Sequence, residues 1–161
     1  MSAFHDLVAS IDYPMFIVTA AAGARRGGCL VGFVTQSSIQ PPRLLVCISK
    51  ANATFDVASQ AEMLAVHFLD QDDRGLARLF GEETGDEVDK FSRCQWEPGP
   101  GGVPVLPQCK GWVAGTIRQR LDCGDHVAHL LEPVDGAMAR GDGVALTFQQ
   151  LRDLKPGHPP D

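Results

Sequence analysis

Short apolar runs alternate with polar segments rich in glycine and proline along most of the chain, a pattern typical of strands joined by turns. About six or seven strands are expected on this pattern. Their predicted ranges are residues 15–20, 29–35, 43–49, 63–69, 111–121, 126–133 and 144–148. Because strands and helices do not alternate regularly, the pattern disfavours a parallel doubly wound sheet and favours an antiparallel barrel.

Peripheral helices are predicted where apolar residues recur at helical spacing. Residues 2–10 carry an apolar stripe, residues 54–61 begin at Thr54, whose hydroxyl would cap the helix, and residues 72–80 begin with acidic side chains. The polar, Gly/Pro-rich segment 81–102 has the length of a functional loop or a lid. One domain over residues 1–161 is expected, with its core at about 13–150 and a flexible tail at 151–161.

Composition excludes several classes of function. A net charge of −6 and a pI near 5.3 argue against a nucleic-acid surface, which needs a basic stripe. No apolar run reaches the length of a bilayer span, and the first residues lack the basic start and apolar segment of a secretory signal. Five scattered cysteines do not resemble a disulfide framework. A cytoplasmic protein with reduced thiols is therefore expected.

Candidate chemistry begins in residues 28–54, where apolar strands lead into two polar segments, 35–38 and 49–54. Such a layout suits a ligand with an apolar plate and an anionic tail. The second segment combines small residues, hydroxyl and amide groups and one cation, which is the inventory that holds a phosphate at a helix start. Its candidate ligand-binding residues are Ser49, Lys50, Ala51, Asn52 and Thr54. The spacing alone favours the alternative, a capped helix start with an exposed lysine.

Histidines give a second set of candidates. Gly124, Asp125 and His126 form a predicted turn that would present the imidazole to a ligand, although an incidental histidine after a Gly-Asp turn is the alternative. Cys123 and His126 have a C-x-x-H spacing, but further paired ligands are missing from the sequence, so no metal site is expected. His67 lies within a predicted strand and is interpreted as a packed residue.

Taken together, these segments resemble the flavin reductase-like family, whose fold is the FMN-binding split barrel. The resemblance covers roughly residues 13–134 and depends on the order and spacing of several motifs. The motifs are the glycine-led strand into TQSS at 35–38, the prolines at 41–42, LLVCISKANAT at 44–54, the strand at 63–68, DKF at 89–91, Trp96 with PVL at 104–106, and GDH at 124–126. The implied fold is a mainly β, antiparallel split β-barrel with peripheral helices.

The resemblance also implies positions for a bound flavin. It places the isoalloxazine against residues 30–35, which include Gly32, Phe33, Val34 and Thr35, and the ribityl phosphate at residues 49–54. It implies that Lys90 and Phe91 close over the flavin, with Lys90 approaching the phosphate, and that His126, with Asp125, lies on the nicotinamide side.

Departures from the family pattern concern ring recognition. Many members carry hydroxyl residues where this chain has Leu30, Gly32 and Phe33, so backbone groups at positions 32–34 would replace those side chains. Ala51 and Asn52 also stand where serines are common. FMN, FAD, a deazaflavin and a weakly held substrate flavin are all compatible with these changes.

The activity implied by the resemblance is flavin reduction, in which a hydride passes from NAD(P)H to FMN or FAD. The family further implies a homodimer with flavin near the subunit interface and a partner monooxygenase that receives the reduced flavin. One alternative is a flavin- or deazaflavin-binding split barrel without efficient NAD(P)H turnover, and another is an interaction barrel without a cofactor. The choice between NADH and NADPH is left open, since no residue that reads the ribose can be assigned.

Overall fold

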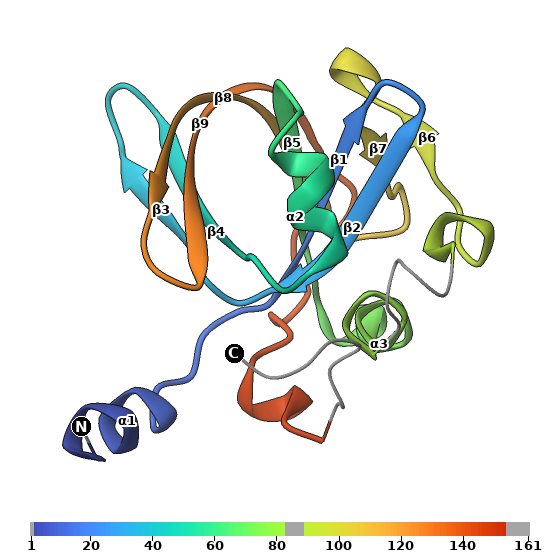
Figure 1. Cartoon of the computed structure of the whole chain (residues 1–161). Helices are drawn as coiled ribbons and strands as arrows, with labels where there is room; N and C mark the ends of the chain where they lie inside the picture. Colours follow the sequence, from blue (N-terminus) through green and yellow to red (C-terminus); the bar gives the residue numbers. More distant parts are fainter. Residues whose placement is uncertain (1, 83–88, 154–161) are drawn as a thin grey trace.

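The computed structural model of the protein describes residues 2–82 and 89–153 and is dominated by one antiparallel sheet that curls into a barrel (Figure 1). The sheet has seven strands in the order β2-β1-β5-β8-β9-β4-β3. Their bounds are β1 Phe16–Ala22, β2 Arg25–Val31, β3 Val34–Ser38, β4 Arg43–Ser49, β5 Met63–Phe68, β8 Gly111–Asp122 and β9 His126–Met138. A small second sheet pairs β6, Glu97–Pro98, with β7, Pro104–Val105. The predicted mainly β split barrel is thus confirmed.

Alternation of side chains along each strand builds the barrel core. On β4, Val46 and Ile48 are fully buried, whereas Leu45, Cys47 and Ser49 between and beside them are partly exposed. Inward residues of this kind from β1, β2, β4, β5 and β9 form one apolar cluster. Helix α2, Ala53–Ala58, packs against β1, β2 and β4 and buries Val57 and Ala58 in that cluster. The helix therefore covers the side of the barrel between β2 and β4.

The other helices lie around the barrel. Helix α1, Ser2–Ala9, stands away from it and has no buried residue, and α3, Arg74–Glu82, buries one face against a second apolar cluster (Figure 1). Four 3-10 turns complete the described elements: η1 Gln71–Asp73, η2 Lys90–Ser92, η3 Pro100–Gly102 and η4 Gln149–Leu151. No helix within residues 2–82 and 89–153 is long and apolar enough to cross a membrane.

Four local predictions are corrected by the structure. Residues 29–35 are not one strand, because β2 ends at Val31 and β3 begins at Val34. Helix α2 is capped by Asn52, whose Oδ1 accepts the backbone N–H of Thr54, and not by the hydroxyl of Thr54. Residues 144–148 form two isolated bridges, because they run between the segments at Pro14 and Asp70.

The fourth correction concerns the tail. Leu151 lies in η4, is 5% exposed and belongs to the second apolar cluster, so the predicted flexible segment does not begin there. Residues 154–161 of the predicted tail lie outside the described residues, as do residues 83–88 of the predicted lid.

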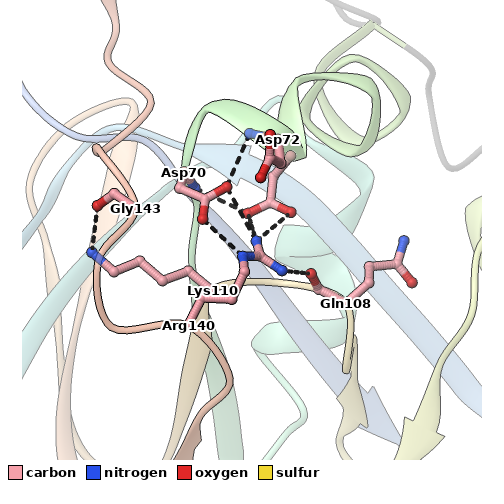
Figure 2. Close-up of polar contacts among 7 residues, drawn as sticks. Asp70, Asp72, Gln108, Lys110, Arg140 and Gly143 are labelled. Atoms are coloured by element: carbon pink, nitrogen blue, oxygen red, sulfur yellow. Dashed lines mark hydrogen bonds and ion pairs between the residues drawn. The ribbon is translucent and has the colours of Figure 1, made fainter.

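An ion cluster around two buried carboxylates ties the segment after β9 to η1. The Arg140 guanidinium donates to both carboxylate oxygens of Asp70, to the carboxylate of Asp73 and to the carbonyl of Gln108, at 2.7–3.1 Å (Figure 2). Hydrogen bonds from Arg140 lower the pKa of Asp70, whereas burial raises the pKa of Asp73. This cluster fixes the start of the segment that carries Phe148 back toward Tyr13.

His67 is a fully buried structural residue, as its interpretation from the sequence predicted. Its Nδ1 lies 3.0 Å from the carbonyl of Ile17, and its Nε2 accepts the backbone N–H of Leu106 at 2.9 Å. Since Nε2 accepts a hydrogen bond, Nδ1 carries the proton and the ring is neutral. His67 thereby joins β1 and β5 to the segment that follows β7.

Candidate functional site

A groove of about 200 Å³ opens where β2 ends, β4 leads into α2 and β9 begins. Strand order explains this meeting point, because β4 pairs with both β3 and β9 and puts Ser49 directly opposite His126. The backbone N–H of Lys50 also donates to the carbonyl of Asp125 at 2.8 Å, which joins the two loops. The groove is lined by Tyr13, Met15, Cys29, Leu30, Val31, Gly32, Phe33, Cys47, Ser49, Asn52, His126 and Phe148.

The break between β2 and β3 forms one side of the groove. At Gly32, a Cβ atom would overlap the ring of Tyr13, so glycine lets that ring pack against the backbone. The carbonyl of Phe33 accepts the N–H of Cys47 at 2.9 Å, and the N–H of Val34 donates to the carbonyl of Gly32 at 3.1 Å. Gly32 and Phe33 line the groove as predicted, whereas Val34 and Thr35 continue into β3 behind it.

The loop from Ser49 to Thr54 borders the opposite end. Ser49 and Asn52 line the groove, and their side-chain oxygens accept the N–H groups of Ala51 and Thr54. Thr54 itself is 2% exposed and lies beneath the surface. The loop is therefore a fixed polar end wall rather than a loose segment.

Lys50 makes an ion pair that the sequence did not reveal. Its Nζ lies 2.9 and 3.0 Å from the two carboxylate oxygens of Asp122, in a pair whose side chains are 38% and 69% exposed. Hydrogen bonds from Lys50 and from the backbone of Gly124 hold the pKa of Asp122 below its usual value. A solvent-exposed pair of this kind is weak, so an anion at the loop can compete for the ammonium group.

His126 stands at the rim beside the loop. Its Nδ1 lies 2.7 Å from Oδ1 of Asp125, and its side chain is 18% exposed. The ring of Phe33 lies 4.9 Å from the imidazole, centroid to centroid, at an interplanar angle of 43°. Asp125 and Phe33 thus hold the imidazole from two directions.

Lys90 and Phe91 are not brought to the groove. The Lys90 side chain is buried, and its Nζ donates to the carbonyls of Gly28 and Phe80 at 3.0 and 3.1 Å. Phe91 packs edge-on against Phe80 and Trp96 in the second apolar cluster. Their evident role is to hold α3 and the segment after residue 88 against β2.

Two aromatic residues of the groove escaped the sequence analysis. Tyr13 and Phe148 come from opposite ends of the chain and stack at 4.9 Å with an interplanar angle of 15°. The N–H of Phe148 donates to the carbonyl of Tyr13 at 2.9 Å. Tyr13 is the only tyrosine of the chain and comes just before the first predicted strand, and this was the one sequence feature that could have marked it as a site residue. No sequence feature marks Phe148 in this way.

The cysteines of the groove offer neither a nucleophile nor a metal ligand. Burial raises the pKa of Cys29 to about 11 and also raises the pKa of Cys47, so both are thiols at neutral pH. Among the described residues, no three His, Cys, Asp or Glu side chains lie close enough together to hold a metal ion.

The donor set of the groove fits a flavin. Its floor and aromatic wall are apolar, and its polar groups gather at the end formed by Ser49, Asn52 and His126. A planar ring with a polar tail needs such an arrangement, in which apolar walls contact the ring and a polar end receives the tail. The volume of the groove is below the roughly 300–1,000 Å³ of typical small-molecule pockets.

Comparisons with known proteins point the same way. Residues 8–155 match the family model described as the flavin reductase like domain. The FMN reductase (NADH) RutF of Pseudomonas syringae pv. syringae is 29% identical over 98% of this chain and 88% of its own length. The 4-hydroxyphenylacetate 3-monooxygenase reductase component of Escherichia coli is 31% identical over 92% of this chain and 88% of its own. The structure of a flavin reductase domain protein from Arthrobacter sp. FB24 superposes with a TM-score of 0.83 at 25% identity, covering 92% of this chain and 91% of the other.

Proposed function

The chain belongs to the flavin reductase-like domain family, and from this membership we propose that it is an NAD(P)H-dependent oxidoreductase that reduces FMN or FAD. The observation that carries the proposal is the groove, in which apolar walls meet a loop of small polar residues and a histidine. A bound flavin would supply the hydride acceptor, N5 of its ring, for C4 of the nicotinamide. The protein contributes alignment of the two rings and exclusion of water.

Each side of the groove has a proposed role in binding the flavin. Gly32 and Phe33 border the ring of the flavin, and the loop that contains Ser49, Ala51 and Asn52 receives its phosphate. Lys50 exchanges Asp122 for that phosphate. Lys90 and Phe91 act from a distance, by fixing β2 at Gly28.

Replacing His126 by alanine is expected to weaken NAD(P)H use more than flavin binding. The imidazole stands at the rim with Asp125 behind it, where it would contact the nicotinamide side. Loss of one such contact predicts roughly a tenfold rise in the KM for NADH or NADPH. Steady-state oxidation of the nucleotide gives the KM, and fluorescence titration gives the Kd of FMN.

His5→Ala is the matched control, because His5 is exposed on α1 and far along the chain from the groove. It should change neither constant. Equal losses of flavin and nicotinamide binding in His126→Ala, or no loss at all, would show that His126 does not serve the reductant.

The test of the function as a whole is direct. The purified protein is examined for a bound yellow chromophore and then assayed for oxidation of NADH and NADPH with added FMN or FAD. Turnover supports the reductase. Colour without turnover supports the second candidate, a flavin- or deazaflavin-binding protein without efficient turnover, which the contact of Phe33 with His126 favours. Absence of both would exclude the two candidates together.

Assembly and location complete the proposal. A homodimer would complete the small groove, and Phe33, which lines it and is 54% exposed, provides apolar surface there. All five cysteines lie in the described part of the chain and are unpaired there, which suits the cytoplasm. A monooxygenase that receives the reduced flavin is suggested by the name of the Escherichia coli relative. Sedimentation analysis tests the dimer.

A further inference from the structure

Phe33 is an aromatic residue in an exposed position whose backbone is nevertheless fixed. The residue is 54% exposed. Its carbonyl accepts the N–H of Cys47, and the break that precedes β3 is closed by the hydrogen bond from Val34 to Gly32. The ring therefore extends from a fixed backbone at the groove and is partly exposed to solvent.

The ring of Phe33 lies against the imidazole of His126. Their centroids are 4.9 Å apart at 43°, and Tyr13 stands on the other side of Phe33 at 6.4 Å and 54°. His126 is on the groove rim, yet its side chain is only 18% exposed. Phe33 thus occupies space beside His126 that a planar ligand ring would need.

We propose that Phe33 is a gate over His126 that a nicotinamide ring displaces when it binds. The inference rests on the proposed function, which assigns His126 to the reductant side. In the ligand-free protein the ring of Phe33 takes the place of the nicotinamide, and rotation about its side-chain bonds moves it toward solvent. Phe33 then limits the affinity for the nucleotide without touching the loop that receives the phosphate of the flavin.

The size of the effect follows from the contact that must be broken. An aromatic pair of this geometry is worth a factor of roughly 2 to 12 in an equilibrium constant. The apparent Kd of a ligand rises in inverse proportion to the fraction of protein in the open, binding-competent state. Removal of the ring should therefore tighten nucleotide binding by about that factor. A ring that instead formed a wall for the ligand would predict the opposite sign.

Equilibrium binding distinguishes a gate, whose removal lowers the Kd of the nucleotide, from a wall, whose removal raises it. Calorimetric titration with NAD⁺ and NADP⁺, which cannot donate a hydride, is carried out on the purified protein in the presence of saturating FMN. Phe33→Ala and Phe33→Leu should lower the Kd of the nucleotide about 2- to 12-fold, with FMN kept saturating for each protein according to its own FMN titration. Phe33→Leu keeps apolar bulk at the site in case the alanine variant folds poorly. Ile39→Ala is the control, since Ile39 is 80% exposed and does not line the groove.

A second readout needs no nucleotide. In the ligand-free protein, the NMR signals of the His126 ring should shift in Phe33→Leu, because the ring current of Phe33 is lost. Unchanged His126 signals, or a nucleotide Kd that rises or stays constant in the variants, would overturn the gate while leaving the reductase in place. If the nucleotides bind neither the wild type nor any variant, the proposed reductase activity and the proposed gate are both rejected.

Discussion

Replacing Arg140 by alanine is expected to lower the free energy of unfolding by about 3–5 kcal/mol. Its guanidinium donates to both oxygens of Asp70 and to Asp73, whose side chains are 3% and 5% exposed. The variant leaves two buried carboxylates without their cation, and the cost of an uncompensated buried charge exceeds the worth of the pair itself. The segment from β9 to Phe148 should loosen along with it, since Arg140 also holds the carbonyl of Gln108.

Urea unfolding followed by circular dichroism at pH 7 measures this loss. Arg118→Ala is the control, because Arg118 is 56% exposed and its Nε lies 3.7 Å from Glu132. An exposed pair of this kind contributes at most about 1 kcal/mol. Similar losses in the two variants would show that the buried cluster is no more important than a surface pair.

The second large effect is on the pH dependence of stability. Burial lowers the pKa of His67 from its usual 6.5 to about 4, and burial also lowers the pKa of His129. Well above pH 6.5 these rings are neutral in the folded and the unfolded chain, so they add no pH dependence to the stability there. Between pH 6.5 and 4 the unfolded chain takes up the His67 proton and the folded chain does not, so stability falls as the pH falls, and the lowered pKa of His129 acts in the same direction. For His67 alone the loss approaches about 3 kcal/mol near pH 4.

The comparison that isolates this effect uses His67→Gln. Glutamine retains one donor and one acceptor for Ile17 and Leu106 but cannot be protonated in this range. Urea unfolding at pH 7, 6, 5 and 4.5 should show a shallower decline for this variant than for the wild type. His5→Gln, a change on the exposed helix α1, should keep the full decline. Identical slopes for all three proteins would refute a neutral, buried His67.

Local patterns predicted the strands well where a strand is buried on one face. Residues 43–49 were predicted from their apolar run and match β4, and residues 63–69 differ from β5 by one residue. The same reasoning failed at residues 144–148, which are as apolar as a strand. Their backbone hydrogen bonds go to Met15 and Leu69, which are distant in sequence, so no local pattern could show that they do not join the sheet.

The candidate site was predicted in part. Ser49, Asn52, Gly32, Phe33 and His126 were predicted to share a site and do line one groove. Lys90 was expected at the phosphate because the family resemblance implies that it closes over the flavin. In the fold its ammonium group is buried and donates to the carbonyls of Gly28, which is far from it in sequence, and of Phe80 on α3.

The sequence by itself determined the mainly β class, the family and the order of the polar loops, because these depend on local side-chain alternation and on motif spacing. Only the tertiary structure decided which side chains meet. It paired Ser49 with His126, Lys50 with Asp122, Tyr13 with Phe148 and Phe33 with His126. The physical reason is that strand pairing sets these contacts between residues far apart in the chain, where local propensity carries no information.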